Sequence, residues 1–411
     1  MPTHPVSPLA PEKFPDMPPL AGVRFAAIES GIRYKGRNDV LLAELAPGTT
    51  VAGVFTLNRM PGAPVDWCRS ILKRGTARGL VVNAGNANVF TGKAGVAATR
   101  GTANAAAKAL DCDPRDIYLA STGVIGQPLA YEKIVDAMPR LMQGLADDTF
   151  PLAAQTIMTT DTFAKGAIAT TRIDGKPVTV AGFCKGSGMI QPDMATMLCF
   201  LFTDAKLPAK VLQAMLGPSA NASFNCMTVD GDTSTSDTVL LFATGQAAHK
   251  PVARASDPRL KGFRKALDAV LRDLAIQVAR DGEGASKFIA VTIKGAASDA
   301  AAKRIALTVA NSPLVKTAIA GEDANWGRVV MAVGRAGEKA NRDKLKIWMG
   351  GVLIARNGAV DPKYDEATVM PHMRGREIDI QVDVGVGKGK ATVWTCDLTH
   401  GYIDINGSYR S

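Results

Sequence analysis

The stretch from Lys185 to Leu198 places a threonine where its hydroxyl could become a nucleophile. It reads Lys-Gly-Ser-Gly-Met-Ile-Gln-Pro-Asp-Met-Ala-Thr-Met-Leu, so a glycine-spaced loop leads through Pro192 to Thr196. Pro192 excludes a helix at its own position and favours extended geometry in the residue before it. The residues after Thr196 are apolar and contain neither glycine nor proline, which predicts a buried strand. Thr196 is therefore expected where a loop becomes a core strand.

A threonine hydroxyl attacks a carbonyl group efficiently only when a base removes its proton. The threonine's own α-amino group supplies that base if the peptide bond before it is cut. A free α-amine has a pKa of ~7.7–8.0, so part of it is neutral at cytosolic pH. Ala195 is small and the nearby glycines permit strained backbone, so we expect self-cleavage between Ala195 and Thr196. The competing interpretation is that Thr196 simply begins a core strand.

The same stretch resembles the processing site of the glutamate N-acetyltransferase/ornithine acetyltransferase family of arginine biosynthesis. Six further blocks resemble family blocks in the family's order, and the similarity runs from about Gly22 to the last residue. These blocks are Asn83–Asn88 with Thr91-Gly92, Ser121–Gly126, Met158–Thr162, Asp230–Thr235, Asp281–Ala285 and Ile405–Ser411. Several blocks in one order are more specific than any one block.

The resemblance implies a two-step acetyl transfer from N2-acetylornithine to glutamate, with an acetyl-threonine intermediate at the nucleophile. It implies an oxyanion hole at Thr122 and Gly123. It also implies a set of substrate-binding residues, which are Thr159, Lys185, Thr196, Glu283, Asn406 and Ser411. Adjacent residues of an extended chain point to opposite faces, so only one of Thr159 and Thr160 is expected at the site, and the family spacing favours Thr159. The family more often ends in threonine, but Ser411 keeps the hydroxyl.

The resemblance further implies a processed assembly. A Pro-rich leader (1–21), expected to be disordered or loosely attached, would precede an α chain of residues 22–195 and a β chain of residues 196–411. In the family these chains stay together and pair as an α2β2 heterotetramer. No bound cofactor is expected. Acetyl-coenzyme A stays open as a co-substrate, because the sequence contains no phosphate-binding loop that would decide the matter.

The composition indicates a cytoplasmic protein with small acidic substrates. Lysine and arginine (48) exceed aspartate and glutamate (38), giving a net charge of +10, but the excess forms no run, so nucleic-acid binding is not expected. The six cysteines form no CxxC pair and the four histidines lack metal-ligand spacing, which indicates reduced thiols and no metal site. The sequence contains neither a long apolar stretch nor a signal peptide, so no membrane association is expected.

The predicted elements mix strands and helices over a chain too long for one core, which predicts an α/β or α+β protein of two domains. Strands are expected at 23–28, 40–45, 50–56, 79–83, 116–120, 196–202, 237–243, 287–294, 345–349, 352–356, 376–384, 390–396 and 402–406, with a hairpin at Asp174-Gly175. Helices are expected at 93–110, 131–145, 258–280, 299–310 and 325–335. The resemblance implies layered sheets covered by helices, as in the amidohydrolases with an N-terminal nucleophile.

Two other functions fit the same residues. A self-processing aminopeptidase or amidohydrolase would use Thr196 but release the acyl group to water. A non-enzymatic amino-acid-binding protein would keep the fold without the cut.

Overall fold

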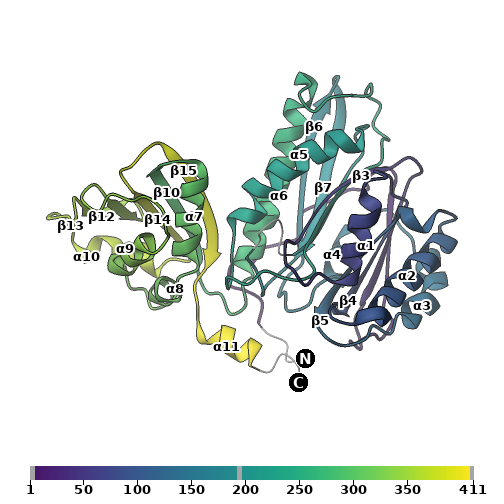
Figure 1. The fold of residues 1–411 in the computed structure, drawn as a ribbon, viewed down its shortest axis with the longest axis horizontal. Helices are drawn as coiled ribbons and strands as arrows, with labels where there is room; N and C mark the ends of the chain where they lie inside the picture. The colour runs from purple at the N-terminus through teal and green to yellow at the C-terminus, as the bar shows by residue number, and fades with distance from the viewer. Residues whose placement is uncertain (1–4, 192–196, 408–411) are drawn as a thin grey trace.

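The computed structural model describes residues 5–191 and 197–407. The predicted cleavage residues Ala195 and Thr196, and the predicted ligand Ser411, lie outside the described residues. Figure 1 shows a larger lobe built from β1–β9 with α1–α6, and a smaller lobe built from β10–β15 with α7–α10. This confirms the predicted mixed α/β class, and the two lobes divide after α6 and not at the predicted processing site between residues 195 and 196.

Two sheets face each other in the larger lobe. One sheet has the order β1 (Val23–Ile28), β2 (Val40–Leu45), β4 (Gly79–Asn86), β5 (Ile117–Val124). The other has the order β3 (Thr50–Phe55), β9 (Thr238–Ala243), β8 (Leu198–Thr203), β7 (Lys176–Lys185), β6 (Lys165–Ile173). Between them lies an aromatic cluster of Phe25, Phe150, Phe183, Phe202 and Phe242, in which neighbouring rings meet edge-on or stacked.

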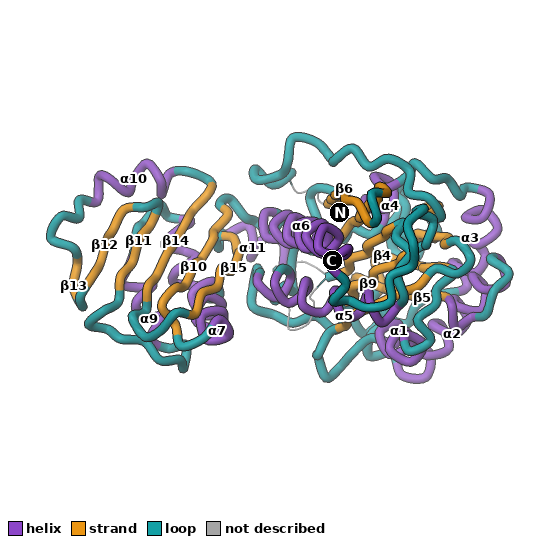
Figure 2. Tube along the Cα trace, turned by 90° about the horizontal axis from the view of Figure 1, so that it is seen from above, coloured by secondary structure: helices purple, strands orange, loops and turns teal. Residues whose placement is uncertain are grey.

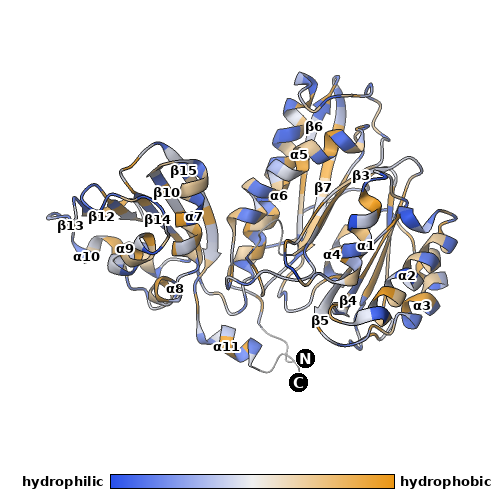
Figure 3. Cartoon of the chain, viewed as in Figure 1, coloured by the Kyte–Doolittle hydropathy of each residue, from blue (hydrophilic) through white to orange (hydrophobic). Residues whose placement is uncertain are grey.

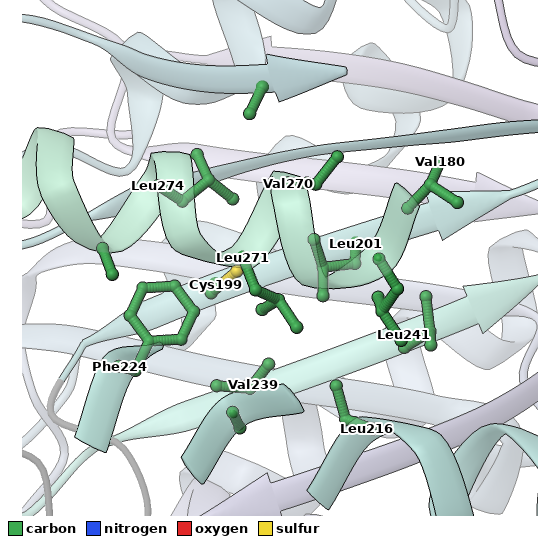
Figure 4. Packing of buried hydrophobic residues seen from close by; sticks show 14 of the residues in the cluster. Val180, Cys199, Leu201, Leu216, Phe224, Val239, Leu241, Val270, Leu271 and Leu274 are labelled. Carbon is green, nitrogen blue, oxygen red and sulfur yellow. The ribbon is translucent and has the colours of Figure 1, made fainter. Parts of the chain in front are cut away.

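Helices cover the outer faces of both sheets, giving four layers. The helices α2 (Gly92–Ala109) and α3 (Glu132–Gln143) pack on the first sheet, and α5 (Ala209–Ala222) and α6 (Lys261–Arg280) pack on the second. Figure 4 shows Leu271 of α6 beside Cys199 and Leu201 of the sheet. Strand β8 is apolar on both faces because Leu198, Phe200 and Phe202 point to the other sheet while Cys199 and Leu201 meet the helices.

Shorter helices complete this lobe. They are α1 (Ala63–Leu72) and α4 (Phe150–Thr156), which add side chains to the core between the sheets, and the 3₁₀ turns Pro114–Asp116, Phe224–Cys226 and Pro258–Leu260. The predicted hairpin is present: Asp174 (φ 52°) and Gly175 (φ 72°) both have positive φ, as a type I′ turn requires. Figure 3 shows the strands of this lobe mostly apolar, while α2 and α3 carry both polar and apolar residues.

The smaller lobe contains one six-stranded sheet, which Figure 2 shows from above. Its order is β13 (Ala359–Val360), β12 (Val352–Arg356), β11 (Lys346–Met349), β14 (Glu377–Asp383), β10 (Phe288–Ala296), β15 (Gly389–Cys396). Its helices are α7 (Asp299–Ala310), α8 (Pro313–Ala320), α9 (Trp326–Gly334) and α10 (Glu366–Arg374). Burial alternates along β14, so one face of the sheet forms the core of this lobe.

The last described element is the helix α11 (His400–Asn406), where a strand at 402–406 was predicted. The alternation Tyr-Ile-Asp-Ile suggested a strand, but the Thr399 side chain accepts a hydrogen bond from the Gly401 amide and so caps a helix. Figures 1 and 2 both place α11 at the junction of the two lobes. The prediction of a strand is therefore wrong. None of the described helices is long and apolar enough to cross a membrane.

The described part of the Pro-rich leader, residues 5–21, is packed against the protein, so for these residues the expectation of a loosely attached segment is wrong. Leu9, Met17 and Leu20 are buried in the hydrophobic cores. The Ser7 amide donates to the Thr162 hydroxyl over 2.9 Å, and the Ser7 hydroxyl donates to the Arg280 carbonyl over 2.7 Å. Composition alone suggested disorder, but the apolar residues between the prolines bury enough surface to hold the segment in place.

Replacing Leu20 with alanine is expected to lower the free energy of unfolding by about 2–5 kcal/mol, because the side chain is 3 % exposed and its loss leaves a cavity. The matched control is Val6→Ala in the same segment, where the side chain is 61 % exposed and the expected change is within about 0.5 kcal/mol. Urea unfolding measures both. Equal effects would contradict the packed leader.

Candidate functional site

A cavity of about 260 Å³ gathers every predicted site residue that the structure describes. It lies where the ends of β5 and β7 meet the turn after α6 and the end of α11. The predicted residues that line it are Thr122, Gly123, Thr159, Lys185, Glu283 and Asn406, and the remaining wall includes Thr160, Met189 and 234–236. Segments separated by almost three hundred positions in the chain therefore meet at one site.

Gly123 occupies a place that only glycine can take. The parallel strands β4 and β5 end side by side, with Gly85 opposite Gly123. Gly123 has φ +129°, and a Cβ there would lie 2.3 Å from the Gly85 carbonyl carbon. The close approach of the two strands brings Thr122 and Gly123 to the cavity wall together.

Lys185 brings a buried ammonium group to the cavity from the end of β7. Its Nζ donates to the Thr159 hydroxyl over 2.8 Å and to the Thr122 hydroxyl over 3.1 Å. Burial lowers the pKa of Lys185, and the carboxylate of Asp161 opposes this shift. An ammonium has three N–H donors, so the group can bind a ligand carboxylate in addition to the two hydroxyls.

The bond from Lys185 also directs the Thr122 hydroxyl. Because Thr122 Oγ1 accepts from the ammonium, its own hydrogen is available to another acceptor. A hydroxyl polarised in this way, next to Gly123, suits a negatively charged oxygen in the cavity.

Glu283 lines the same cavity as Lys185 and is held by polar neighbours. Asn406 of α11 donates to Glu283 Oε2 over 2.6 Å. Burial raises the pKa of Glu283, while hydrogen bonds from Asn406 and Thr160 oppose the rise. Glycine at position 188 lets the backbone of this loop lie against the Glu283 carboxylate, because a Cβ there would lie 2.4 Å from the Glu283 carboxyl carbon.

Both threonines of the 159–160 pair line the cavity, so the expectation that only one faces the site is wrong. Thr159 bonds to Lys185, and Thr160 bonds to Glu283. The segment is an irregular turn, and the strict alternation of a strand does not apply to it.

Several carboxylates that hold the site in place were not predicted from the sequence. Asp230 accepts the amides of Met189 and Ile190 over 2.6 and 2.8 Å, and so fixes the loop after Lys185. Asp161 accepts the amides of Thr159 and Gly186 over 3.0 and 2.6 Å. Both aspartates lie within blocks that carry the resemblance, but a block assigns no role to its single members.

The cavity combines a cationic and an anionic group with several hydroxyls, which fits a zwitterionic amino acid or its derivative. Lys185 would take the carboxylate, and Glu283 would take an ammonium. Within residues 5–191 and 197–407, no three metal-ligating side chains lie close enough to hold a metal ion. All six cysteines are free thiols, and none lines the cavity.

A model of the ArgJ family matches residues 24–411. The chain belongs to the ArgJ family. It is 57 % identical over 407 residues to the arginine biosynthesis bifunctional protein ArgJ of Gluconobacter oxydans, covering 99 % of this chain and 96 % of that protein. It is 58 % identical over 409 residues to the protein of the same description from Bradyrhizobium diazoefficiens, covering 99 % of each chain. The resemblance found in the sequence is thus confirmed.

Solved structures of the ArgJ family are also similar to the chain. A crystal structure of the arginine biosynthesis bifunctional protein from Bacillus halodurans has a TM-score of 0.49 and 39 % identity, covering 51 % of this chain and 98 % of that chain. The ornithine acetyltransferase of Mycobacterium tuberculosis, complexed with ornithine, has a TM-score of 0.38 and 33 % identity, covering 43 % of this chain and 94 % of that chain.

Glu283→Gln is expected to change how stability depends on pH. Burial raises the folded-state pKa of Glu283 above the unfolded value of 4.5, so the folded protein keeps a proton that the unfolded chain has lost. The free energy of unfolding therefore falls as the pH rises from 4.5 through the folded pKa. Glutamine loses no proton, so the variant gains stability relative to the wild type as the pH rises through that range.

Urea unfolding across this pH range measures the difference, with Glu132→Gln at an exposed position of α3 as the matched control. Parallel curves for the wild type and Glu283→Gln would contradict the burial of an ionisable Glu283.

Proposed function

We propose that the protein moves an acetyl group from N2-acetylornithine to glutamate through an acetyl ester of Thr196, after cleavage between Ala195 and Thr196. ArgJ family membership and the names of the relatives confirm the predicted enzyme of arginine biosynthesis. One observation carries the proposed mechanism: an ammonium, a carboxylate and the Thr122-Gly123 pair line one cavity. Met197, which follows Thr196 in the chain, lines an adjoining small cavity with Thr122 and Lys185.

Substrate binding is proposed to use the two charged walls. Lys185 binds the carboxylate of acetylornithine, and Glu283, held by Asn406, binds its side-chain ammonium. The Thr159 hydroxyl orients the Lys185 ammonium by accepting a hydrogen bond from it. Ser411 and the Thr196 hydroxyl itself are proposed to complete the contacts with substrate.

Acetylation of the enzyme is proposed as the first chemical step. The free α-amine of Thr196 takes the proton from its hydroxyl, and the oxygen attacks the acetyl carbonyl. The Thr122 hydroxyl and the Gly123 amide stabilise the oxyanion. The bond between the acetyl carbon and the ornithine nitrogen then breaks, the α-ammonium returns its proton to that nitrogen, and ornithine leaves.

The second step repeats the first in reverse with glutamate as acceptor. The neutral amine of glutamate attacks the acetyl-threonine, passes through the same oxyanion and displaces the Thr196 oxygen. The Thr196 α-amine takes a proton from the attacking nitrogen and returns it to the Thr196 oxygen, and N-acetylglutamate leaves. Because water competes with glutamate for the ester, transfer requires that water be kept from the cavity while the acetyl ester exists.

The same resemblance supports proposals about donors, partners and location. Acetyl-coenzyme A is proposed as a second acetyl donor, consistent with the word bifunctional in the names of the relatives. The fragments 1–195 and 196–411 are proposed to stay together and to pair as an α2β2 assembly. We place the enzyme in the cytoplasm, where its six free cysteines would stay reduced.

Thr196→Ala is expected to leave one intact chain of 43.1 kDa in denaturing mass spectrometry, where the wild type gives two fragments divided at Ala195/Thr196. The variant should also lose glutamate-dependent release of ornithine from acetylornithine and, in a parallel assay, glutamate-dependent release of coenzyme A from acetyl-coenzyme A. The matched control is Thr170→Ala, at an exposed position of β6. Transfer at the native rate by Thr196→Ala would contradict the proposal. Release of ornithine by the wild type in the absence of glutamate would indicate a hydrolase instead.

Thr122→Val is expected to lower kcat by about 10²–10³-fold, since it removes an oxyanion donor while preserving the shape of the side chain. Steady-state kinetics with acetylornithine and glutamate measure this effect. Thr99→Val, at a buried threonine in α2 outside the cavity, is the matched control. A kcat within twofold of the wild type would show that Thr122 does not stabilise the oxyanion.

A further inference from the structure

Behind the cavity lies a cluster of buried charges that the mechanism above does not use. The Lys165 side chain is completely buried, and its Nζ lies 2.6 Å from Asp161 Oδ1 and 2.5 Å from Asp281 Oδ2, both on fully buried side chains. The cluster joins the start of β6, the turn before it and the end of α6, elements that pack against each other in the larger lobe. Two carboxylates face one ammonium here, so the cluster as a whole carries negative charge.

Asp161 connects this cluster to the cavity wall. Its Oδ1 accepts the Gly186 amide over 2.6 Å, and its Oδ2 accepts the Thr159 amide over 3.0 Å. Gly186 directly follows Lys185, and Thr159 is the hydroxyl partner of the Lys185 ammonium. One carboxylate therefore holds both the residue that carries the ammonium and the residue that receives its hydrogen bond.

Asp281 supports the same loop from the other side. Its carboxylate accepts the amide and hydroxyl of Thr162 as well as Lys165, and its carbonyl accepts the Ser187 hydroxyl over 2.6 Å. Burial raises the pKa of Asp281, but three donors face its two oxygens, which fits the ionised form. Burial also works against ionisation of Asp161, and the attraction of Lys165 and Lys185 outweighs it, so the pKa of Asp161 lies below its usual range.

We propose that Asp161 is a positioning residue of the transfer site. Its carboxylate, held by Lys165, fixes Thr159 and the turn after Lys185, and it supplies the negative charge that stabilises the Lys185 ammonium. A buried ammonium bonded only to neutral hydroxyls would be costly, so a carboxylate behind the wall is required. The charged groups around Lys185 are Asp161 and Lys165 from the cluster, Glu283 after α6 and Asp237 before β9. The role of Lys185 in substrate binding rests on the proposed function.

The test follows the Lys185 side chain directly, by NMR of the purified protein labelled with ¹³C at the lysine ε position. Lys185→Arg assigns the resonance. Asp161→Asn keeps the shape of the side chain but removes its charge, so the titration midpoint of Lys185 is expected to fall. Lys165→Met removes the opposing positive charge, so the midpoint is expected to rise. Both variants remove an ion pair from the cluster. If Asp161 had a purely structural role, the Lys185 midpoint would therefore shift in the same direction in both.

Kinetics provide the second readout. Asp161→Asn is expected to raise KM for acetylornithine by about 10-fold or more, because the group that binds its carboxylate is less often charged and less well placed. The matched control is Asp361→Asn in the smaller lobe, where a buried aspartate pairs with Arg356 at 2.6 Å and accepts the Lys363 amide at 2.7 Å. This control should lower the thermal midpoint without moving the Lys185 titration or KM.

The outcomes are separable. An unchanged Lys185 midpoint in Asp161→Asn, shifts of the same sign in both variants, or an equal effect of Asp361→Asn would overturn the proposal. If neither cluster variant folds, the wild-type resonance still decides, because a neutral Lys185 amine at pH 7 contradicts the proposed stabilisation and an ammonium supports it. If the protein fails to transfer acetyl groups but the midpoints move in opposite directions, the proposed function falls while the positioning role stands.

Discussion

The site depends on a positive charge held inside the protein. An ammonium removed from water needs acceptors for its protons and a negative charge nearby. Strand β7 delivers Lys185 to the cavity wall, and the hydroxyls of Thr122 and Thr159 accept its hydrogen bonds. This requirement explains why hydroxyls line the wall and why carboxylates lie both behind it and in the same cavity. It also explains why the irregular turn at 159–161 is anchored so firmly.

The four-layer arrangement makes this meeting of segments possible. Thr122 belongs to one sheet and Lys185 to the other, and the two sheets face each other across an aromatic core. Thr122 near the end of β5 and Lys185 at the end of β7 come within hydrogen-bond distance of each other. Glycine at positions 85 and 123 allows the closest approach, and α11 from the junction of the lobes adds the final wall.

Much of this could be predicted from the sequence, where local signals were strong. The alanine-rich helix α2 follows from the high helix propensity of alanine, and the hairpin follows from the preference of Asp-Gly for a type I′ turn. The strand β8 follows from its short, continuous apolar run. The six described site residues followed from the family resemblance. Elements that depend on distant partners were missed: the packed leader depends on pockets formed by the rest of the chain, and α11 depends on a threonine cap that outweighs a strand-like pattern.

The supporting carboxylates could not be predicted for the same reason. Asp161 and Lys165 are four residues apart, a spacing that on its own suggests an ordinary surface pair. Their burial arises only because Asp281, more than a hundred residues later, reaches the same point. Sequence spacing reports neighbours along the chain, whereas the charge balance of a buried site is set by neighbours in space.

The order of strands in the second sheet bears on what happens to a chain severed between Ala195 and Thr196. Strands β9 and β8 come from the later part of the chain, and they lie between β3 on one side and β7 with β6 on the other, all from the earlier part. In a chain severed there, two strands of the later fragment would lie between strands of the earlier fragment. Separating the two fragments would break the hydrogen bonds between β3 and β9 and between β8 and β7, and would expose the apolar core. The fragments should therefore remain associated until a denaturant unfolds the sheet.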